Sequence, residues 1–269
     1  MTARTRIAAI GLCLLLAGVG SYLRADYQEE FSKTVPLKAG GLFSLENVNG
    51  RVSISTWKED KAEIKALKVA ERDKENLKKV EIIVEESAGG VVVRAVWPKY
   101  SHNLRVSVDF DIRVPEGTNL RGVETVNGDV QVTGPYGSIG VSTTNGGIEA
   151  SAAKGDLDAE TTNGDILVRG VEGRVKVETT NGSIRLEQVR FAGGIEAETT
   201  NGGITLRLED PDKVNASLRA ETTNGHISFD FPVTLKKIKK APHSLEVEIG
   251  QGGPEILLST TNGSITITR

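Results

Sequence analysis

Cysteine and aromatic residues are scarce in this sequence, and neither sign of charge is in large excess. Its 269 residues include 1 cysteine, Cys13, which lies in an apolar N-terminal stretch. Once that stretch is removed, disulfides are excluded as a source of stability. Aromatic residues make up 4%, which is low for a compact globule and normal where stacked short side chains fill a narrow core. The formal net charge is −3, with acidic and basic residues interspersed, which argues against a nucleic-acid partner.

Motifs for catalysis and for metal or phosphate binding are missing as well. The 3 histidines, His102, His226 and His243, stand in unrelated contexts without the spacing of metal ligands. No glycine-rich phosphate loop opens a helix, and no nucleophile elbow occurs. The sequence therefore predicts neither a cofactor nor a metal centre.

The N-terminus has the pattern of an export signal. Arg4 and Arg6 precede an apolar stretch over residues 7–19, and Leu23-Arg24-Ala25 can serve as a cleavage site before Asp26. We therefore expect residues 1–25 to be a signal peptide and the protein to be exported to the periplasm, the cell envelope or the exterior. The alternative is a retained signal anchor of about 17 residues, at the lower limit for a membrane span. Membrane contact is expected only through such an anchor.

An internal repeat is the strongest signal in the sequence. Asn-Gly pairs recur, and six of the eight stand in an identical Thr-Thr-Asn-Gly string. From the second pair onward the steps are 18, 18, 18, 20, 23 and 38 residues. The asparagines are Asn49, Asn127, Asn145, Asn163, Asn181, Asn201, Asn224 and Asn262.

Each copy of the repeat alternates apolar and polar residues around the Asn-Gly pair. Apolar residues stand four residues before the asparagine and three residues after it, as Ala159 and Ile166 do around Asn163. A second glycine follows ten residues after the asparagine in the 18-residue copies. Each copy is therefore expected to form strand, Asn-Gly turn, strand and glycine turn, with one buried face.

Two all-β architectures are compatible with this pattern. In a β-solenoid, similar to a parallel β-helix, each copy of about 18 residues is one rung, and equivalent residues stack about 4.8 Å apart, with the asparagines as a structural ladder. In an antiparallel β-hairpin meander, each Asn-Gly is a two-residue hairpin loop. A hairpin has no use for the same threonines and the same small apolar residue in every copy. Since a solenoid puts each position in the same environment, we favour the solenoid.

The regular repeat occupies only part of the chain. Residues 26–120 are expected to form an N-terminal β segment that holds the first copy and strands capping the array. Residues 121–269 are expected to form the Thr-Thr-Asn-Gly solenoid, with an insertion at about 230–255. The insertion carries Leu235-Lys236-Lys237-Ile238-Lys239-Lys240, which we interpret as a solvated loop or a lysine-protected sheet edge.

Several of these motifs resemble a known bacterial family. The residues are Phe43–Gly50 (FSLENVNG), Val114–Gly117 (VPEG), Thr125–Gly128 (TVNG) and the Thr-Thr-Asn-Gly series. Over residues 35 to 269 the chain resembles a domain family of unknown function called "putative adhesin", or β-strand-repeat protein. The resemblance implies an envelope or secreted location and a β-solenoid-like body. It supplies no catalytic residues.

One acidic set of residues is a candidate binding feature. Three residues before the asparagine the copies carry Glu124, Ser142, Glu160, Glu178, Glu198 and Glu221, which a solenoid would align as an outward stripe. Neighbouring bases such as Lys176 and Arg219 make this an ordinary solvated face. The alternative is a weak cation-binding stripe, because carboxylates are suitable ligands for divalent cations.

The function that we expect is a non-catalytic exported module, an adhesin-like scaffold that binds a polysaccharide or another envelope protein. The alternative is a polysaccharide-active lyase or hydrolase, since parallel β-helices also host such enzymes. Those enzymes need carboxylates clustered on neighbouring rungs. The outward positions two and four residues after the asparagine read Asp129/Gln131, Gly147/Glu149, Asp165/Leu167 and Ser183/Arg185, so that Asp129 and Asp165 would lie two rungs apart with Gly147 between them.

Overall fold

The computed structural model describes residues 26–71, 73–87, 89–99, 104–189, 193–208, 214–230 and 235–269, and the side chains of 238 onward within the last range. The expected signal peptide, Cys13 and His102 lie outside the described residues.

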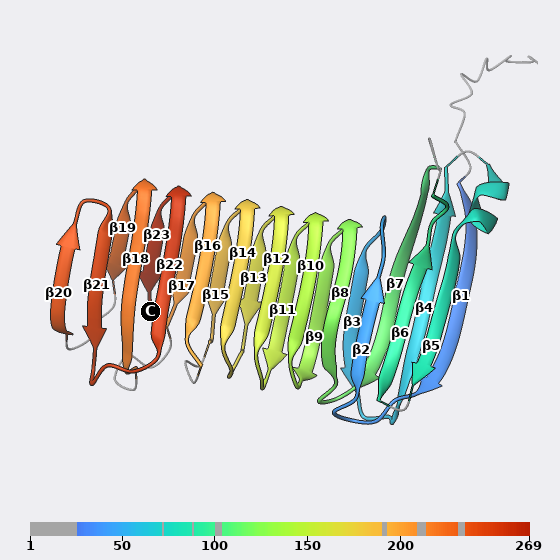
Figure 1. Cartoon of the computed structure of the whole chain (residues 1–269), viewed down its shortest axis with the longest axis horizontal. Helices are drawn as coiled ribbons and strands as arrows, with labels where there is room; N and C mark the ends of the chain where they lie inside the picture. The colour runs from blue at the N-terminus through green and yellow to red at the C-terminus, as the bar shows by residue number, and fades with distance from the viewer. Residues whose placement is uncertain are drawn as a thin grey trace, which may run out of the picture.

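Two long β-sheets lie face to face and form a rod (Figure 1). Sheet A contains, in spatial order, β1 (Tyr27–Pro36), β4 (Lys61–Ala70), β7 (Val106–Pro115), β3 (Val52–Trp57), β9 (Val130–Tyr136), β11 (Ile148–Ala153), β13 (Ile166–Arg169), β15 (Ile184–Glu187), β17 (Ile204–Arg207), β23 (Ile265–Thr268) and β19 (Ile227–Asp230). Sheet B contains β20 (Leu235–Ala241), β21 (Ser244–Ile249), β18 (Ala216–Asn224), β22 (Glu255–Asn262), β16 (Ile195–Asn201), β14 (Val175–Asn181), β12 (Leu157–Asn163), β10 (Ile139–Asn145), β8 (Asn119–Asn127), β2 (Leu42–Glu46), β6 (Gly90–Val96) and β5 (Glu81–Ser87). A short 3₁₀ helix, η1 (Lys74–Lys79), lies against β1 and β4.

Parallel pairing of equivalent residues confirms the β-solenoid. Each copy gives one strand to sheet B, turns at Asn-Gly, and gives the next strand to sheet A. Glu160 of β12 is the direct partner of Glu178 of β14, and Ile166 of β13 is the partner of Ile184 of β15. The meander alternative is wrong, because the consecutive strands of the repeat copies, from β8 to β19, alternate between the sheets and do not pair with each other.

The core lies between the two sheets, and the alternation of each strand determines which side chains enter it. Ala159, Ile166 and Val168 are almost completely buried, whereas Glu160 between them in the repeat is exposed. Because short aliphatic side chains fill the space, the sheets need few aromatic residues. Tyr136 is an exception: burial raises the pKa of its phenol, and its hydroxyl donates to the carbonyl of Ile54 at 2.8 Å.

The order of rungs in space differs from their order in the chain. The last copy, β22–β23, lies between β16–β17 and β18–β19, so that Asn262 stands between Asn201 and Asn224. The first copy, β2–β3, neighbours β8–β9, and the strands of residues 61–115 lie on its other side. Both sheets run without a break across residues 120 and 121, so the expected N-terminal segment and the solenoid share one core.

Additional strands extend the rod at both ends. At the N-terminal end, Lys68 points into the core beside η1; its ammonium group donates to the carbonyls of Leu77 (3.1 Å) and Val80 (3.2 Å) and pairs with Glu29. At the other end, the expected insertion is the hairpin β20–β21, and β20 is the outermost strand of sheet B. The lysine-rich segment is thus a sheet edge.

Candidate functional site

Stacked side chains at the Asn-Gly corner fix the spacing of the surface. The first threonine of each string points inward, and its hydroxyl donates to a glycine carbonyl of the neighbouring rung, as from Thr161 to Gly146 at 3.0 Å. Each asparagine amide except that of Asn49 donates to the side-chain oxygen of the asparagine on the neighbouring rung toward Asn49, at 2.7–2.9 Å. The ladder runs through Asn49, Asn127, Asn145, Asn163, Asn181, Asn201, Asn262 and Asn224.

The corner glycines are needed because the rungs approach closely. A Cβ atom on Gly164 would lie 1.9 Å from the carbonyl oxygen of Gly146, and one on Gly182 would lie 1.9 Å from that of Gly164. These glycines do not have the positive φ that a type I′ hairpin requires; of the eight corner glycines only Gly50 has a positive φ. The Asn-Gly pair therefore does not form a hairpin here; its glycine lets neighbouring rungs approach closely.

The outer face of sheet B carries two regular rows of side chains, and we call it the candidate face. The second threonines of the strings form an exposed row beside the asparagines: Thr144, Thr162, Thr180, Thr200, Thr261 and Thr223. The second row, three residues before the asparagine, contains the predicted acidic stripe. In spatial order it reads Glu46, Glu124, Ser142, Glu160, Glu178, Glu198, Ser259, Glu221.

The structure corrects the expected stripe in two respects. Glu198 and Glu221 are not neighbours, because Ser259 of the inserted rung lies between them. Glu46, which the sequence analysis did not include, continues the row beyond Glu124. Its position three residues before Asn49 would have revealed it. The longest unbroken run of carboxylates is therefore Glu160, Glu178 and Glu198.

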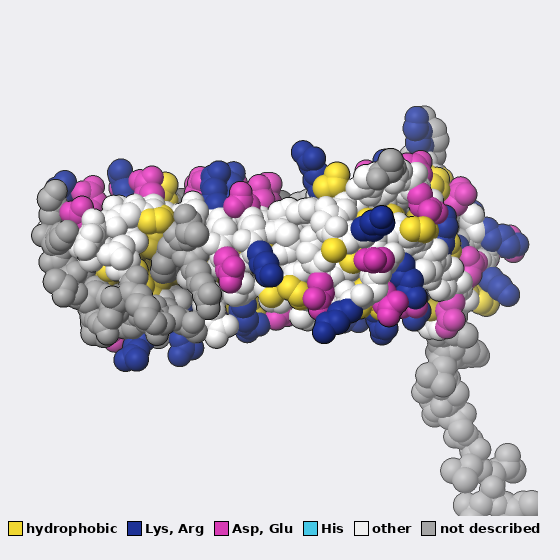
Figure 2. All heavy atoms as spheres, turned by 90° about the horizontal axis from the view of Figure 1, so that it is seen from below, with side chains coloured by type: hydrophobic (Ala, Val, Ile, Leu, Met, Phe, Trp, Pro, Cys, Tyr) yellow, Lys and Arg dark blue, Asp and Glu magenta, His cyan; other side chains and the backbone are white. Residues whose placement is uncertain are grey.

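Basic side chains neutralise part of this row. The Lys176 ammonium lies 2.7 Å from the Glu178 carboxylate, and this hydrogen bond raises the pKa of Lys176. Arg219 contacts Glu221 at 2.7 Å in the same way. Among the described residues no ion pair reaches Glu160 or Glu198. On the side of the rod opposite the Asn-Gly corners, Figure 2 shows acidic and basic side chains interspersed, without a large area of one sign.

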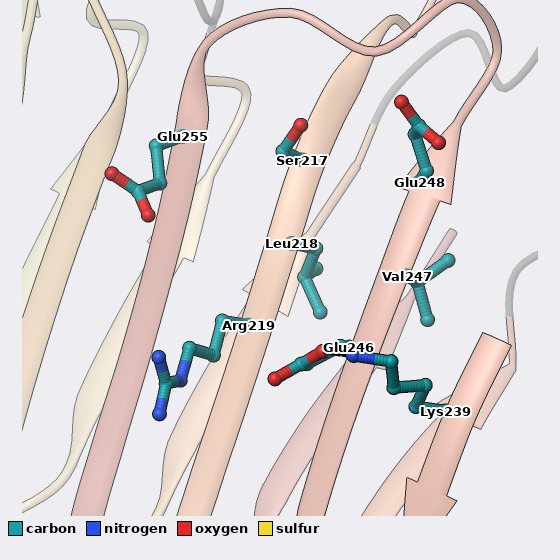
Figure 3. Close-up of a pocket in the computed structure, with 8 residues that line it drawn as sticks. All are labelled: Ser217, Leu218, Arg219, Lys239, Glu246, Val247, Glu248 and Glu255. Atoms are coloured by element: carbon teal, nitrogen blue, oxygen red, sulfur yellow. Dashed lines mark hydrogen bonds and ion pairs between the residues drawn. The ribbon is translucent and has the colours of Figure 1, made fainter. Parts of the chain in front are cut away.

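Shallow depressions follow the candidate face. One of about 490 Å³ lies at its N-terminal part and is lined by both rows, including Glu124, Glu160 and Thr162. Another, of about 360 Å³, lies between β22, β18 and β21 near the other end (Figure 3). There Glu255 and Glu248 flank Ser217, while Arg219 and Glu246 lie below them. These hollows offer hydroxyl and carboxylate groups to a partner that lies along the sheet.

The two aspartates considered as catalytic carboxylates accept hydrogen bonds from the backbone of the next rung. Asp129 accepts the backbone N–H of Gly147 at 2.8 Å, and Asp165 accepts that of Ser183 at 2.7 Å. Each aspartate thus fastens its rung to the next. Within the described ranges no group of three or more His, Cys, Asp or Glu side chains could hold a metal ion. No helix of the described part of the chain is long and apolar enough to cross a membrane.

Comparisons with known proteins place this architecture in a family. Several solved structures have low similarity: a "putative cell adhesion protein" from Clostridium sporogenes (14% identity, 89% of this chain and 99% of that chain, TM-score 0.36), a "putative adhesin" from Bacteroides fragilis (12%, 89% and 96%, 0.43) and one from Parabacteroides merdae (10%, 90% and 96%, 0.38). Among curated proteins none matches the sequence. The family described as Toastrack DUF4097 matches residues 34–268, which confirms the resemblance found in the sequence. The chain belongs to the Toastrack DUF4097 family.

Proposed function

We propose that the protein is an exported, non-catalytic scaffold of the cell envelope or cell surface, and that the candidate face binds an extended partner. The observation that carries the proposal is the repetition of one surface. At the strand spacing of about 4.8 Å, the same threonine recurs on six successive rungs and the same glutamate on three of them, at Glu160, Glu178 and Glu198. A partner that lies along the rod meets the same groups many times, and so gains affinity from many weak contacts.

The chemistry of the candidate face favours a partner rich in hydroxyl or amino groups. Threonine hydroxyls both donate and accept hydrogen bonds, and unpaired carboxylates such as Glu160 and Glu198 accept them. An envelope polysaccharide that contains amino sugars provides such groups.

Co-sedimentation with isolated envelope polysaccharide tests the proposal. We expect the full chain to be retained, and the double variant Thr162→Lys/Thr180→Lys to lose most of the retention. The matched control, Thr205→Lys/Thr266→Lys, places the same substitutions on the outer face of sheet A and should bind as the unmodified chain does. Failure to bind, or equal loss in both variants, contradicts the proposal.

Two further measurements address catalysis and export. Incubation with the polysaccharide should produce no new reducing or unsaturated ends; their appearance would support the lyase or hydrolase alternative. The N-terminus of the protein recovered outside the cytoplasm should lie near Asp26. Recovery of an uncleaved soluble protein in the cytoplasm would contradict export.

A further inference from the structure

The two ends of the rod carry opposite charges on the outermost strands of sheet B. At one end, β20 contains four lysines, of which Lys239 and Lys240 are exposed. At the other end, β5 contains Glu81, Glu85 and Glu86, all exposed. Both strands are seven residues long, and among the described residues each has a partner strand on one side only. Figure 1 shows them at opposite ends of the molecule.

The two sheets also end at different levels, in a complementary way. Beyond the rung β18–β19, the described part of sheet B continues with β21 and β20, whereas sheet A ends at β19. Beyond the rung β2–β3, sheet A has three more strands and sheet B only two, so that β1 projects past β5. When β20 of one copy lies beside β5 of the next, β1 of that next copy projects past its β5 and covers the inner face of β20.

An apolar side chain on β20 is left uncovered in the single chain. Ile238 is the cross-strand partner of Val247, so both side chains lie on the core side of sheet B. Val247 is 4% exposed, but Ile238 is 54% exposed. The next copy would cover Ile238 with Phe31, which is only partly buried on the core side of its β1; Val35 on the same side is already buried in its own chain.

We propose that copies of this chain associate head to tail, with β20 of one copy pairing with β5 of the next. The pairing is antiparallel, because β20 runs in the direction of the central strands and β5 runs against them. Charge makes the contact selective: β20 repels another β20, β5 repels another β5, and each attracts the other. This contact is heterologous, so the product is an open filament in which sheet B is continuous. The inference goes beyond the proposed function and does not depend on the partner of the candidate face.

One interaction of the single chain must rearrange. The Lys33 ammonium donates to the Val84 carbonyl of β5 at 3.2 Å and lies 3.5 Å from the Glu86 carboxylate. On pairing, a backbone N–H of β20 takes over the carbonyl, and Lys33 keeps its ion pair with Glu86. In the single chain this lysine therefore protects the free edge.

Sedimentation of the full chain at increasing concentration tests the proposal through two charge reversals. Reversal of all four lysines of β20 (Lys236→Glu/Lys237→Glu/Lys239→Glu/Lys240→Glu) makes both edges acidic, and Glu81→Lys/Glu85→Lys/Glu86→Lys makes both basic. Each variant alone should stay monomeric where the unmodified chain associates. An equimolar mixture of the two should associate again, because each basic edge then meets an acidic one. The control Arg185→Glu/Arg207→Glu, on the outer face of sheet A, should associate as the unmodified chain does.

Salt and folding measurements complete the test. Association of the unmodified chain should weaken as ionic strength rises, since exposed charges are screened. Thermal unfolding should show that each variant is still folded at the temperature of the sedimentation assay, so that unfolding cannot imitate loss of association. A chain that stays monomeric at all concentrations, reversals that have no effect, or a mixture that stays monomeric would each overturn the proposal.

Discussion

Replacement of a corner glycine by alanine is the most direct test of how the rungs stack. In Gly164→Ala the new methyl group would lie 1.9 Å from the carbonyl oxygen of Gly146, whereas an unstrained contact needs more than 3 Å. The rungs must separate by about 1 Å, a shift too large for the backbone to absorb locally. A change of side-chain rotamer cannot relieve the clash, because the methyl group is fixed to the backbone of one rung and the oxygen belongs to the backbone of the next.

The expected loss in free energy of unfolding follows from the hydrogen bonds that this separation strains. Gly146 donates to the carbonyl of Asn163 at 3.0 Å, Thr161 donates to the carbonyl of Gly146 at 3.0 Å, and the Asn163 amide donates to Asn145 at 2.9 Å. Overpacking costs about 1–3 kcal/mol, and each weakened hydrogen bond adds about 1 kcal/mol. We expect Gly164→Ala to lower the free energy of unfolding by about 4–6 kcal/mol.

Urea denaturation followed by circular dichroism measures this loss, with Gly140→Ala as the matched control. Gly140 lies on β10, where a Cβ atom would meet nothing closer than 3.4 Å, so its replacement should change stability by less than about 1 kcal/mol. If Gly164→Ala and Gly140→Ala unfold at the same urea concentration, the close-approach explanation is wrong.

Four further outcomes are expected. Gln188 has a φ of 56°, so Gln188→Gly should raise the free energy of unfolding by about 0.5–1 kcal/mol in the same urea assay; a loss would contradict the strain argument. Ile184→Asp should cost several kcal/mol because it buries an unpaired charge, whereas Glu160→Gln should stay within about 0.5 kcal/mol; equal midpoints would disprove the inward and outward assignment. Glu160→Cys/Glu178→Cys should oxidise within one folded monomer, seen as loss of both thiols, because the two residues are direct neighbours; resistance to mild oxidation would be evidence against stacked rungs. Millimolar calcium should leave the thermal midpoint unchanged; a rise that Glu178→Ala removes would identify the stripe as a cation site.

The sequence predicts the solenoid but not the order of its rungs. Repetition of the same threonine, asparagine and glycine favours stacking, since each rung places them in the same contacts. The copies at Asn201, Asn224 and Asn262 carry the same string, so the pattern does not determine which neighbours which. The hairpin decides: β21 occupies one edge of β18, and the last rung can pair with β18 only at the other edge. Which strand occupies each edge of β18 depends on long-range contacts, and the repeated residues do not reveal it.

The candidate face was partly predictable for the same reason. Alignment on the asparagine placed Glu160 and Glu178 side by side, as the structure has them. It could not show that Ser259 separates Glu198 from Glu221, because that depends on the rung order. Nor could it show that Asp129 and Asp165 bind the backbone of the next rung, since that depends on side-chain rotamers.

The inserted last rung also governs how the rod forms as the chain is made or exported from its N-terminus. The strands from β8 to β17 can be added one after another, each against a finished edge. β18 and β19 appear next, but their final neighbours, β22 and β23, emerge only about 40 residues later. Until then the growing edge at β16 and β17 is open to the wrong copy, because β18 carries the same string. Correct closure therefore waits for the last strands, and folding of this end should be the slow step, since it requires long-range contacts.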